Sequence, residues 1–266
     1  MNEIVLSIQK LTKQFGDITV VNNLSLAIPH GEVFGLIGSN GAGKTTTIKM
    51  LTTLLKPTSG TAFIAGFDIL KHPADVRRSI GYVPQLLSAD GSLTGYENLL
   101  IFAKLYDIPR SERKKRIDEA FSLMDLTDAK DRFVKNYSGG MIRRLEIAQA
   151  VLHKPSVLFL DEPTVGLDPV ARQSVWNQIE LLKEGGTTII LTTHYMEEAD
   201  FLCTRIAILN KGILVVEGIP DELKASLKKK NATLDDVFSH YAEGIIETGG
   251  TFRDISRTRR TASRLG

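Results

Sequence analysis

A run of glycines, a lysine and two threonines near the start of the chain has the spacing of a phosphate-binding loop. Residues 38–46 fit the pattern GxxxxGK[ST]. Glycines in this pattern let successive backbone N–H groups turn inward around phosphates, Lys44 can reach the β- and γ-phosphates, and the Thr45 hydroxyl is placed to ligate Mg²⁺. The candidate phosphate-binding residues are Gly38, Ser39, Asn40, Gly41, Ala42, Gly43, Lys44, Thr45 and Thr46.

Two adjacent carboxylates follow an apolar run in the second half of the chain. Residues 157–160 are Val-Leu-Phe-Leu, and Asp161 and Glu162 come next. Parallel α/β sheets hold their ligands at the carboxyl ends of the strands, so the pair is expected at the nucleotide site. Asp161 suits the Mg²⁺ site, and Glu162 is placed to polarise a water that attacks the γ-phosphate. The alternative for the pair is the solvated start of a loop.

The segments around the glycine run have the order that a phosphate loop requires. Residues 33–37 form a short apolar run suited to a buried strand. After the loop, Ile48, Leu51 and Leu55 repeat at helical spacing until Pro57. The alternative interpretation is a chance glycine-rich turn. Such a turn would not need a strand before it and a helix after it, whereas both are predicted here.

The remaining pattern predicts an α/β fold with a mainly parallel sheet. Alternation of apolar and polar residues over 3–33 predicts antiparallel strands, and the stretch from about 86 to 150 is predominantly helical in pattern. The Asp168-Pro169 pair marks a helix start between two strands. Strands that alternate with helices indicate a parallel sheet with right-handed crossovers. Further predicted strands cover 61–69, 157–160 and 188–191, and a hairpin covers 206–216 around Asn210-Lys211-Gly212.

Composition excludes several classes of protein. The 266 residues carry 33 basic and 31 acidic side chains, so no global field favours nucleic acid. The single cysteine, Cys203, excludes an intrachain disulfide and fits a reducing compartment. The N-terminus lacks the features of a secretory leader, and no stretch approaches the ~18 apolar residues that span a bilayer. We expect the chain in the cytoplasm unless a partner holds it at a membrane.

Residues 137–141, Tyr-Ser-Gly-Gly-Met, complete a recognisable set of motifs. They match the signature motif, usually LSGGQ, of the nucleotide-binding subunit of ABC transporters, and the chain resembles that family over about residues 3–220. The resemblance implies a P-loop NTPase fold of the ABC type, with an antiparallel β subdomain and a helical subdomain over about 86–150. It also implies that Ser138, Gly139 and Gly140 contact ATP held by an opposite subunit, in a head-to-tail homodimer that forms with ATP.

Four further positions match functional residues of that family. Gln85 resembles the glutamine that meets Mg²⁺ and the attacking water, and His194 resembles the switch histidine at the γ-phosphate. Phe15 resembles the aromatic residue that stacks on adenine, although a phenylalanine near strands is more often a core residue. Asp168 resembles the aspartate of the dimer-interface loop. By this resemblance Glu162, His194, Gln85 and Lys44 are catalytic, and Thr45, Gln85 and Asp161 hold Mg²⁺.

Three positions depart from the family pattern. Tyr137 replaces the usual leucine, Met141 replaces the usual glutamine, and Val165 stands where serine is frequent. Ser138 and Gly140, which would touch phosphate, are retained. The departures therefore put in doubt one polar contact of the signature motif and one hydrogen bond across the dimer, and the sandwiching of ATP should survive.

The resemblance also implies a biological task. The family drives membrane-spanning subunits, so a separate permease is expected, and residues 93–99 resemble the segment that receives its cytoplasmic helices. Residues 233–238 resemble the daunorubicin-resistance type of drug and lipid exporter, which predicts export of a hydrophobic or amphipathic substrate from the cytoplasmic face of the membrane. We expect an ATPase domain over 1–220 and a helical appendage over 221–266. Its basic tail is either a candidate contact for anionic lipid or a solvated terminus. The arginines of this tail are Arg253, Arg257, Arg259, Arg260 and Arg264.

Two rival functions are weighed against export. A soluble ATPase of the ABC type acting on nucleic acid or the ribosome usually has two ATPase units or large insertions, and the near-neutral charge also disfavours nucleic acid as a partner. A nucleotide-gated interaction subunit with low turnover is conceivable because of Tyr137 and Met141. The presence of Glu162 and His194 disfavours that second alternative.

Overall fold

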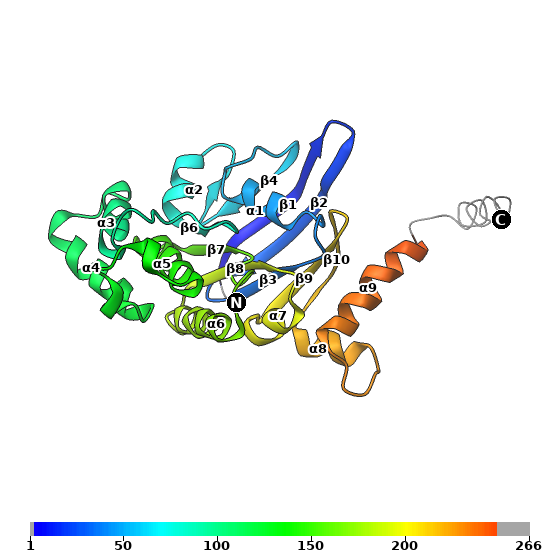
Figure 1. The fold of residues 1–266 in the computed structure, drawn as a ribbon. Coiled ribbons are helices and arrows are strands. Elements are labelled where there is room, and N and C mark those ends of the chain that lie inside the picture. Colours follow the sequence, from blue (N-terminus) through cyan, green and yellow to red (C-terminus); the bar gives the residue numbers. More distant parts are fainter. Residues whose placement is uncertain (1–2, 249–266) are drawn as a thin grey trace, which may run out of the picture.

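The computed structural model describes residues 3–248, arranged as two sheets and a set of helices (Figure 1). From β3 onward, strands alternate with helices along the chain. The strands are β1 Ile4–Phe15, β2 Ile18–Pro29, β3 Val33–Ile37, β4 Ser59–Ile64, β5 Phe67–Asp68, β6 Ile80–Val83, β7 Val157–Asp161, β8 Thr188–Thr193, β9 Arg205–Asn210 and β10 Ile213–Gly218. The helices are α1 Lys44–Leu51, α2 Pro73–Ser79, α3 Gly95–Leu105, α4 Arg110–Leu123, α5 Gly139–Val151, α6 Pro169–Glu184, α7 Met196–Leu202, α8 Pro220–Ser226 and α9 Leu234–Thr248.

A six-stranded sheet in the order β10-β9-β3-β8-β7-β6 forms the centre of the molecule. All neighbours in it are parallel except the hairpin of β9 and β10. Every residue of β3, β7 and β8 is buried, as expected of parallel strands covered on both faces. In register, Ile37 lies opposite Thr193, and Asp161 lies opposite Thr192, so the ends of these three strands share one edge. The predicted α/β fold with a mainly parallel sheet is confirmed.

A second sheet, in the order β2-β1-β4-β5, is antiparallel. The predicted antiparallel strands over 3–33 are therefore present as β1 and β2. The single strand predicted over 61–69 is wrong, because the chain turns after β4 and returns as the short β5. Ala65 and Gly66 have φ of 50° and 83°, a left-handed turn that breaks the extended run.

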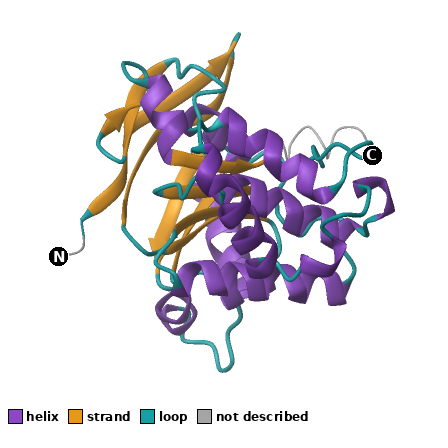
Figure 2. Cartoon of the chain, turned by 90° about the vertical axis from the view of Figure 1, so that its left-hand side faces the viewer, coloured by secondary structure: helices purple, strands orange, loops and turns teal. Residues whose placement is uncertain are grey.

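The period of two along the central strands divides the apolar core into two layers. Leu158 and Leu160 of β7 pack into the layer that contains α5 and α6, whereas Val157 and Phe159 pack into the layer beneath the antiparallel sheet. Most helices gather on one side of the strands (Figure 2). The central sheet is thus fixed from both faces, which gives the loops at its carboxyl edge a rigid base.

A helical part is inserted between β6 and β7, where the helical pattern over about 86–150 predicted one. It contains α3, α4, two short 3₁₀ turns at Thr127–Ala129 and Val134–Asn136, and α5. Thr94 and Glu97 form a capping box that fixes the start of α3. α3 and α4 lie at one end of the molecule and α9 at the other (Figure 1).

The chain continues past β10 into α8 and α9, and Leu234 and Val237 of α9 are buried against the same core as α6. The boundary expected near residue 220 stays a prediction. The five arginines of the basic tail lie outside the described residues. Over residues 3–248, we find no helix with both the length and the apolar character needed to cross a membrane.

Candidate functional site

The phosphate loop connects the buried strand β3 to α1, and its backbone requires glycine. Gly41 and Gly43 have φ of 82° and 102°, and Gly43 precedes α1 without a side-chain cap. A Cβ at Gly38 would lie 2.6 Å from the carbonyl oxygen of Leu209, and one at Gly43 would lie 2.7 Å from that of Val20. The loop is therefore packed against neighbouring backbone, and the amides at the start of α1 carry no side-chain cap, an arrangement suited to an anion.

Lys44 is buried at the base of this loop. Its Nζ donates hydrogen bonds to the carbonyl oxygens of Gly38, at 2.8 Å, and Ser39, at 3.2 Å. The same Nζ lies 3.4 Å from Oε1 of Glu162. The loop carbonyls and this carboxylate hold the ammonium group within the loop, where a phosphate would find a fixed cation.

Asp161 joins the phosphate loop to the strand next to its own. Its Oδ1 accepts hydrogen bonds from Oγ1 of Thr45, at 3.2 Å, and Oγ1 of Thr192, at 2.6 Å. Asp161 is buried at the end of β7. A buried carboxylate next to a threonine hydroxyl offers the hard oxygen ligands that Mg²⁺ takes beside phosphates. Within residues 3–248 there is no group of three His, Cys, Asp or Glu side chains that would hold a metal alone.

Glu162 is the point where three other side chains meet. Its Oε1 lies 3.4 Å from Nζ of Lys44 and 3.3 Å from Nδ1 of His194, and its Oε2 accepts a hydrogen bond of 3.1 Å from Nε2 of Gln85. The contact with His194 lacks hydrogen-bond geometry and is an ion pair only when the imidazole is protonated. Glu162 has φ of 49°, and its N–H donates to the carbonyl and the hydroxyl of Thr192. These bonds hold a strained backbone that turns the carboxylate toward the loop.

Most of these residues line one cleft of about 530 Å³, whereas Gly38, Ser39 and Asp161 are not part of its wall. Its lining consists of Val20, Asn40, Gly41, Ala42, Gly43, Lys44, Thr45, Thr46, Gln85, Glu162, Val165 and His194. The structure thus brings the predicted phosphate loop and all four candidate catalytic residues together.

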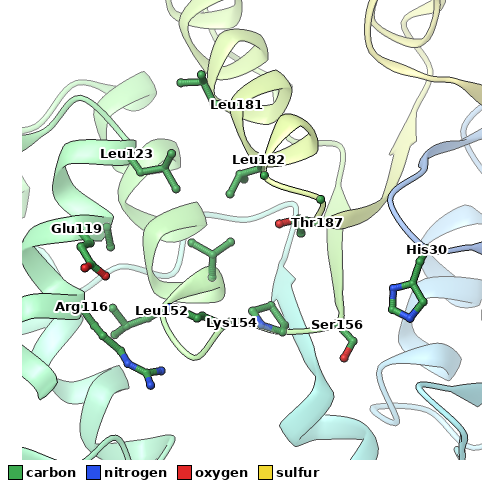
Figure 3. A pocket seen from close by; sticks show the side chains of 15 residues that line it. His30, Arg116, Glu119, Leu123, Leu152, Lys154, Ser156, Leu181, Leu182 and Thr187 are labelled. Atoms are coloured by element: carbon green, nitrogen blue, oxygen red, sulfur yellow. The ribbon is translucent and has the colours of Figure 1, made fainter.

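A second cavity, of about 560 Å³, lies at the opposite edge of the central sheet (Figure 3). Ser156 and Thr187, which precede β7 and β8, are part of its wall, and Leu123, Leu152 and Leu182 supply apolar surface. None of the predicted site residues lines it. The second cavity also has charged side chains in its wall, among them Arg116 and Lys154, but it lacks the phosphate loop and Glu162. We therefore take the first cleft as the site.

The signature segment does not line the cleft of its own chain. The Oγ of Ser138 accepts a hydrogen bond of 3.3 Å from the N–H of Met141, and α5 begins at Gly139. Tyr137 points elsewhere, since its hydroxyl donates to the carbonyl oxygen of Ala129 at 2.7 Å within the helical part. The tyrosine that replaces the usual leucine therefore occupies the core of the helical part, and it leaves the start of α5 unobstructed.

Phe15 and Asp168 also lie outside the cleft lining. Phe15 is 48% exposed, with Nζ of Lys13 at 4.9 Å from its ring centre, so it is not a core phenylalanine. Asp168 caps α6, because its Oδ1 accepts from the N–H groups of Val170 and Ala171 at 3.0 and 2.9 Å. That cap confirms the helix start predicted from Asp168-Pro169.

Three buried charged side chains beside the site could not be recognised from the sequence. Arg143 and Glu146 of α5 pair at 3.0 Å and hold the loop that carries Gln85. Glu198 of α7 accepts hydrogen bonds from Thr164 and Trp176. A charged pair spaced by three on a helix is usually solvated, so only the signature motif just ahead of Arg143 could have drawn attention to it.

Comparisons with known proteins agree with this geometry. The family described as ABC transporter matches residues 21–165. The daunorubicin/doxorubicin resistance ATP-binding protein DrrA of Streptomyces peucetius is 46% identical over 217 residues, which cover 82% of this chain and 66% of that protein. The linearmycin resistance ATP-binding protein LnrL of Bacillus subtilis is 41% identical over 224 residues, covering 84% and 72%. This chain spans about two thirds of the length of the curated relatives that it matches.

A solved structure of similar fold is described as an ATP-binding subunit of an ABC transporter. It superposes with a TM-score of 0.79 at 29% identity and covers 89% of this chain and 99% of that one. With the family match and the relatives above, the chain belongs to the ABC transporter family of ATP-binding proteins.

Proposed function

We propose that this chain hydrolyses ATP as the motor subunit of an exporter and drives a separate integral-membrane permease. The observation that carries the proposal is the convergence of Lys44, His194 and Gln85 on the carboxylate of Glu162, at 3.4, 3.3 and 3.1 Å. A cation, an imidazole and an amide around one carboxylate, beside a phosphate loop, fit hydrolysis of a γ-phosphate better than binding alone.

Each residue has a role that its contacts support. Backbone N–H groups of the loop and the ammonium of Lys44 bind the phosphates. Glu162 accepts the proton of the attacking water, Gln85 orients that water, and His194 contacts the γ-phosphate. Binding of ATP replaces the contact between Lys44 and Glu162 by contacts with phosphate, which leaves Glu162 free to act as a base.

Thr45, Asp161 and Gln85 would hold Mg²⁺. The hydrogen bond between Thr45 and Asp161 already brings a hydroxyl of the cleft wall and a buried carboxylate together. When bound, Mg²⁺ neutralises charge on the β- and γ-phosphate oxygens. Burial of Asp161 among threonine hydroxyls excludes bulk water from this carboxylate and keeps the ligand oxygens oriented.

A head-to-tail homodimer completes the site in the proposal. Ser138, Gly139 and Gly140 stand at the start of α5, where the free amides and the helix dipole suit a phosphate, and they do not line the cleft of their own chain. The partner copy would present this segment to the ATP. Phe15, exposed at the end of β1 in the antiparallel sheet, would stack on adenine, and Asp168 would lie at the dimer interface.

Export of a hydrophobic or amphipathic substrate is supported by the relatives, which are described as daunorubicin, doxorubicin and linearmycin resistance proteins. A permease partner would keep the chain at the cytoplasmic face of the cell membrane. The basic tail would add contact with anionic lipid. The near balance of 33 basic and 31 acidic side chains is consistent with a partner other than nucleic acid.

The proposal is tested with Glu162→Gln, and Glu197→Gln serves as the matched control because Glu197 is an exposed acid on the neighbouring α7. Glu162→Gln should keep ATP affinity, slow hydrolysis by about 10²- to 10⁴-fold, and trap an ATP-bound dimer. The control should match the unaltered chain. Equal turnover in both variants would remove Glu162 from this role.

The trapped variant also serves to find the permease. Tagged Glu162→Gln is captured from solubilised native membranes with ATP, and the associated proteins are identified by mass spectrometry. A stoichiometric partner with several membrane spans supports the exporter. Ribosomal or nucleic-acid-bound partners without a permease would overturn transport and leave ATP hydrolysis in place.

A further inference from the structure

Side chains of α3 and α4 line a groove that shares no residue with the nucleotide cleft. These two helices form one end of the molecule (Figure 1). It has a volume of about 500 Å³. Its complete lining is Tyr96, Leu100, Lys104, Arg110, Arg113 and Lys114. The four charged side chains are all cationic, and the two uncharged ones supply a phenol and an aliphatic wall.

The cations of this groove have no acidic partner among residues 3–248. Within the part of the chain that the structure describes, none of the four lies within ion-pair distance of a carboxylate, and Arg113 instead donates to the carbonyl oxygen of Ile108. Three other cations on or beside α4 do have carboxylate partners. These pairs are Arg116 with Glu112 at 2.7 Å, Lys115 with Glu119 at 3.9 Å, and Lys130 with Asp118 at 3.2 Å.

The position of these cations on α4 is unfavourable without an anion. Arg110, Arg113 and Lys114 lie in the first turns of the helix, where the helix dipole places partial positive charge. Pro109 precedes the helix, and no side chain caps it. The only acid in the first turn, Glu112, is paired with Arg116. A bound anion would relieve repulsion from both the side chains and the helix terminus.

Apolar side chains on α3 indicate the source of that anion. Ile101 and Leu105 are 43% and 70% exposed and follow Leu100 and Lys104 directly in the helix, on the adjacent face. A cationic groove with exposed aliphatic residues at its border has the two features of a surface that rests on a membrane: attraction to anionic headgroups and burial of apolar groups at the acyl boundary.

We propose that the groove between α3 and α4 binds the phosphate headgroups of anionic membrane lipids and orients the helical part against the bilayer. Lys104, Arg110 and Lys114 attract the headgroup, and Ile101 and Leu105 enter the interface. The lysine and arginine side chains are long enough to reach the headgroups while their aliphatic stems stay packed along the groove. This contact is independent of the nucleotide cleft.

The test compares two triple variants of the full chain by flotation with vesicles of equal parts phosphatidylcholine and phosphatidylglycerol. Lys104→Ala/Arg110→Ala/Lys114→Ala empties the groove of exposed charge. Its matched control removes the same charge from the paired cations of the same helical part: Lys115→Ala/Arg116→Ala/Lys130→Ala. Both variants keep the C-terminal arginines, and circular dichroism melting checks that both are folded.

The groove variant should bind these vesicles about 10²-fold more weakly than the unaltered chain, since each cation at an anionic surface contributes about a factor of five. The control should lose much less, and high salt should weaken binding of the unaltered chain. Equal binding by all three proteins, or equal loss in both variants, overturns the proposal.

Two further measurements distinguish lipid headgroups from free phosphate and from an acidic protein segment. Inorganic phosphate is titrated into the vesicle-free proteins, and groove-dependent binding of phosphate without groove-dependent flotation would overturn the lipid assignment. Capture of a permease that depends on the groove, again without flotation, would overturn it in favour of an acidic protein segment. ATP hydrolysis by the groove variant should equal that of the unaltered chain, so that failure here is distinct from failure of the ATPase proposal.

Discussion

Arg143 of α5 is predicted to hold the loop that carries Gln85, and its replacement by alanine tests this. The side chain is 2% exposed. Its guanidinium donates to the carbonyl oxygens of Pro84 and Gln85, each at 2.7 Å, and to Oε2 of Glu146 at 3.0 Å. The other carboxylate oxygen of Glu146 accepts from the N–H and hydroxyl of Ser88. The pair thus fixes both halves of the loop, and Gln85 in turn contacts Glu162.

The size of the effect follows from what Arg143→Ala leaves behind. Glu146 would remain buried without a cation, and two loop carbonyls would lose their donors. Removing one partner of a buried, hydrogen-bonded ion pair costs about 3–5 kcal/mol. A domain of ordinary stability has about 5–15 kcal/mol in total, so the variant should stay folded at low temperature and unfold at much lower denaturant concentration.

The neighbouring Arg144 provides a matched control. It also donates to two backbone carbonyls, those of Met124 and Asp125, but its ionic partner, the Asp125 carboxylate, is 86% exposed. An exposed pair contributes about 0–1 kcal/mol, and each lost hydrogen bond about 1 kcal/mol. Arg144→Ala should therefore cost about 1–3 kcal/mol and leave the Gln85 loop in place.

Urea unfolding of both variants measures the change in the free energy of unfolding. ATP turnover, at a temperature where both are folded, measures the effect of each variant on the position of Gln85. We expect turnover of Arg143→Ala to fall at least about tenfold with ATP affinity nearly unchanged, because Gln85 and Glu162 act on the water and not on the bound nucleotide. The double variant Arg143→Ala/Glu146→Ala should be less unstable than the sum of its single variants. Equal stability and equal turnover in Arg143→Ala and Arg144→Ala would refute the reasoning.

Three further predictions concern other buried groups. Lys44→Ala should weaken ATP binding and hydrolysis, since the γ-phosphate loses its nearest fixed cation, and wild-type affinity in a nucleotide titration would contradict the phosphate-loop assignment. Glu198→Ala should lower the free energy of unfolding by about 2–6 kcal/mol, because the hydroxyl of Thr164 and the indole N–H of Trp176 lose their acceptor. Glu198→Gln should retain most of the stability, because its amide oxygen still accepts hydrogen bonds. Burial lowers the pKa of His153 from 6.5 to about 4, so the unfolded chain takes up its proton first as pH falls. Unfolding experiments should therefore show a loss of about 2 kcal/mol between pH 7 and pH 5 that is absent in His153→Gln.

The phosphate loop and the strand-end acids could be predicted because short-range pattern determines them. A glycine run after an apolar strand constrains its own backbone, and Asp161 and Glu162 follow a strand whose neighbours are fixed by parallel pairing. Contact between Lys44 and Glu162 then follows from strands that end at the same edge. The cleft was thus predictable without knowing the path of the rest of the chain.

Features that depend on the approach of distant segments were not predictable. The helical pattern after the phosphate loop extends to Leu55, but α1 ends at Leu51, and Thr53 has φ of 62°. Glu198 follows the predicted switch histidine by only four residues, yet its partners lie on the segment after Glu162 and on α6. Side-chain type alone does not distinguish such a buried acid from the exposed acid beside it, Glu197.

Tyr137, which stands where the family usually has leucine, depends on a small residue elsewhere in the chain. A Cβ at Gly95 would lie 2.3 Å from the Tyr137 hydroxyl, so the tyrosine requires glycine at the start of α3. That hydroxyl bonds to Ala129, and the carbonyl of the next residue, Lys130, accepts from the N–H of Tyr96. The start of α5 is therefore tied to the start of α3.

α5 is consequently fastened at two places to the segments that surround it. Tyr137 links its start to α3, and Arg143 links its second turn to the loop that carries Gln85. Because interfaces of this kind are packed and hydrogen-bonded, displacement of α3 must carry α5 and the loop with it. If a permease docks at residues 93–99, the segment that the sequence indicates for this contact, such a displacement would reach Glu162 through the amide of Gln85, 3.1 Å from its carboxylate.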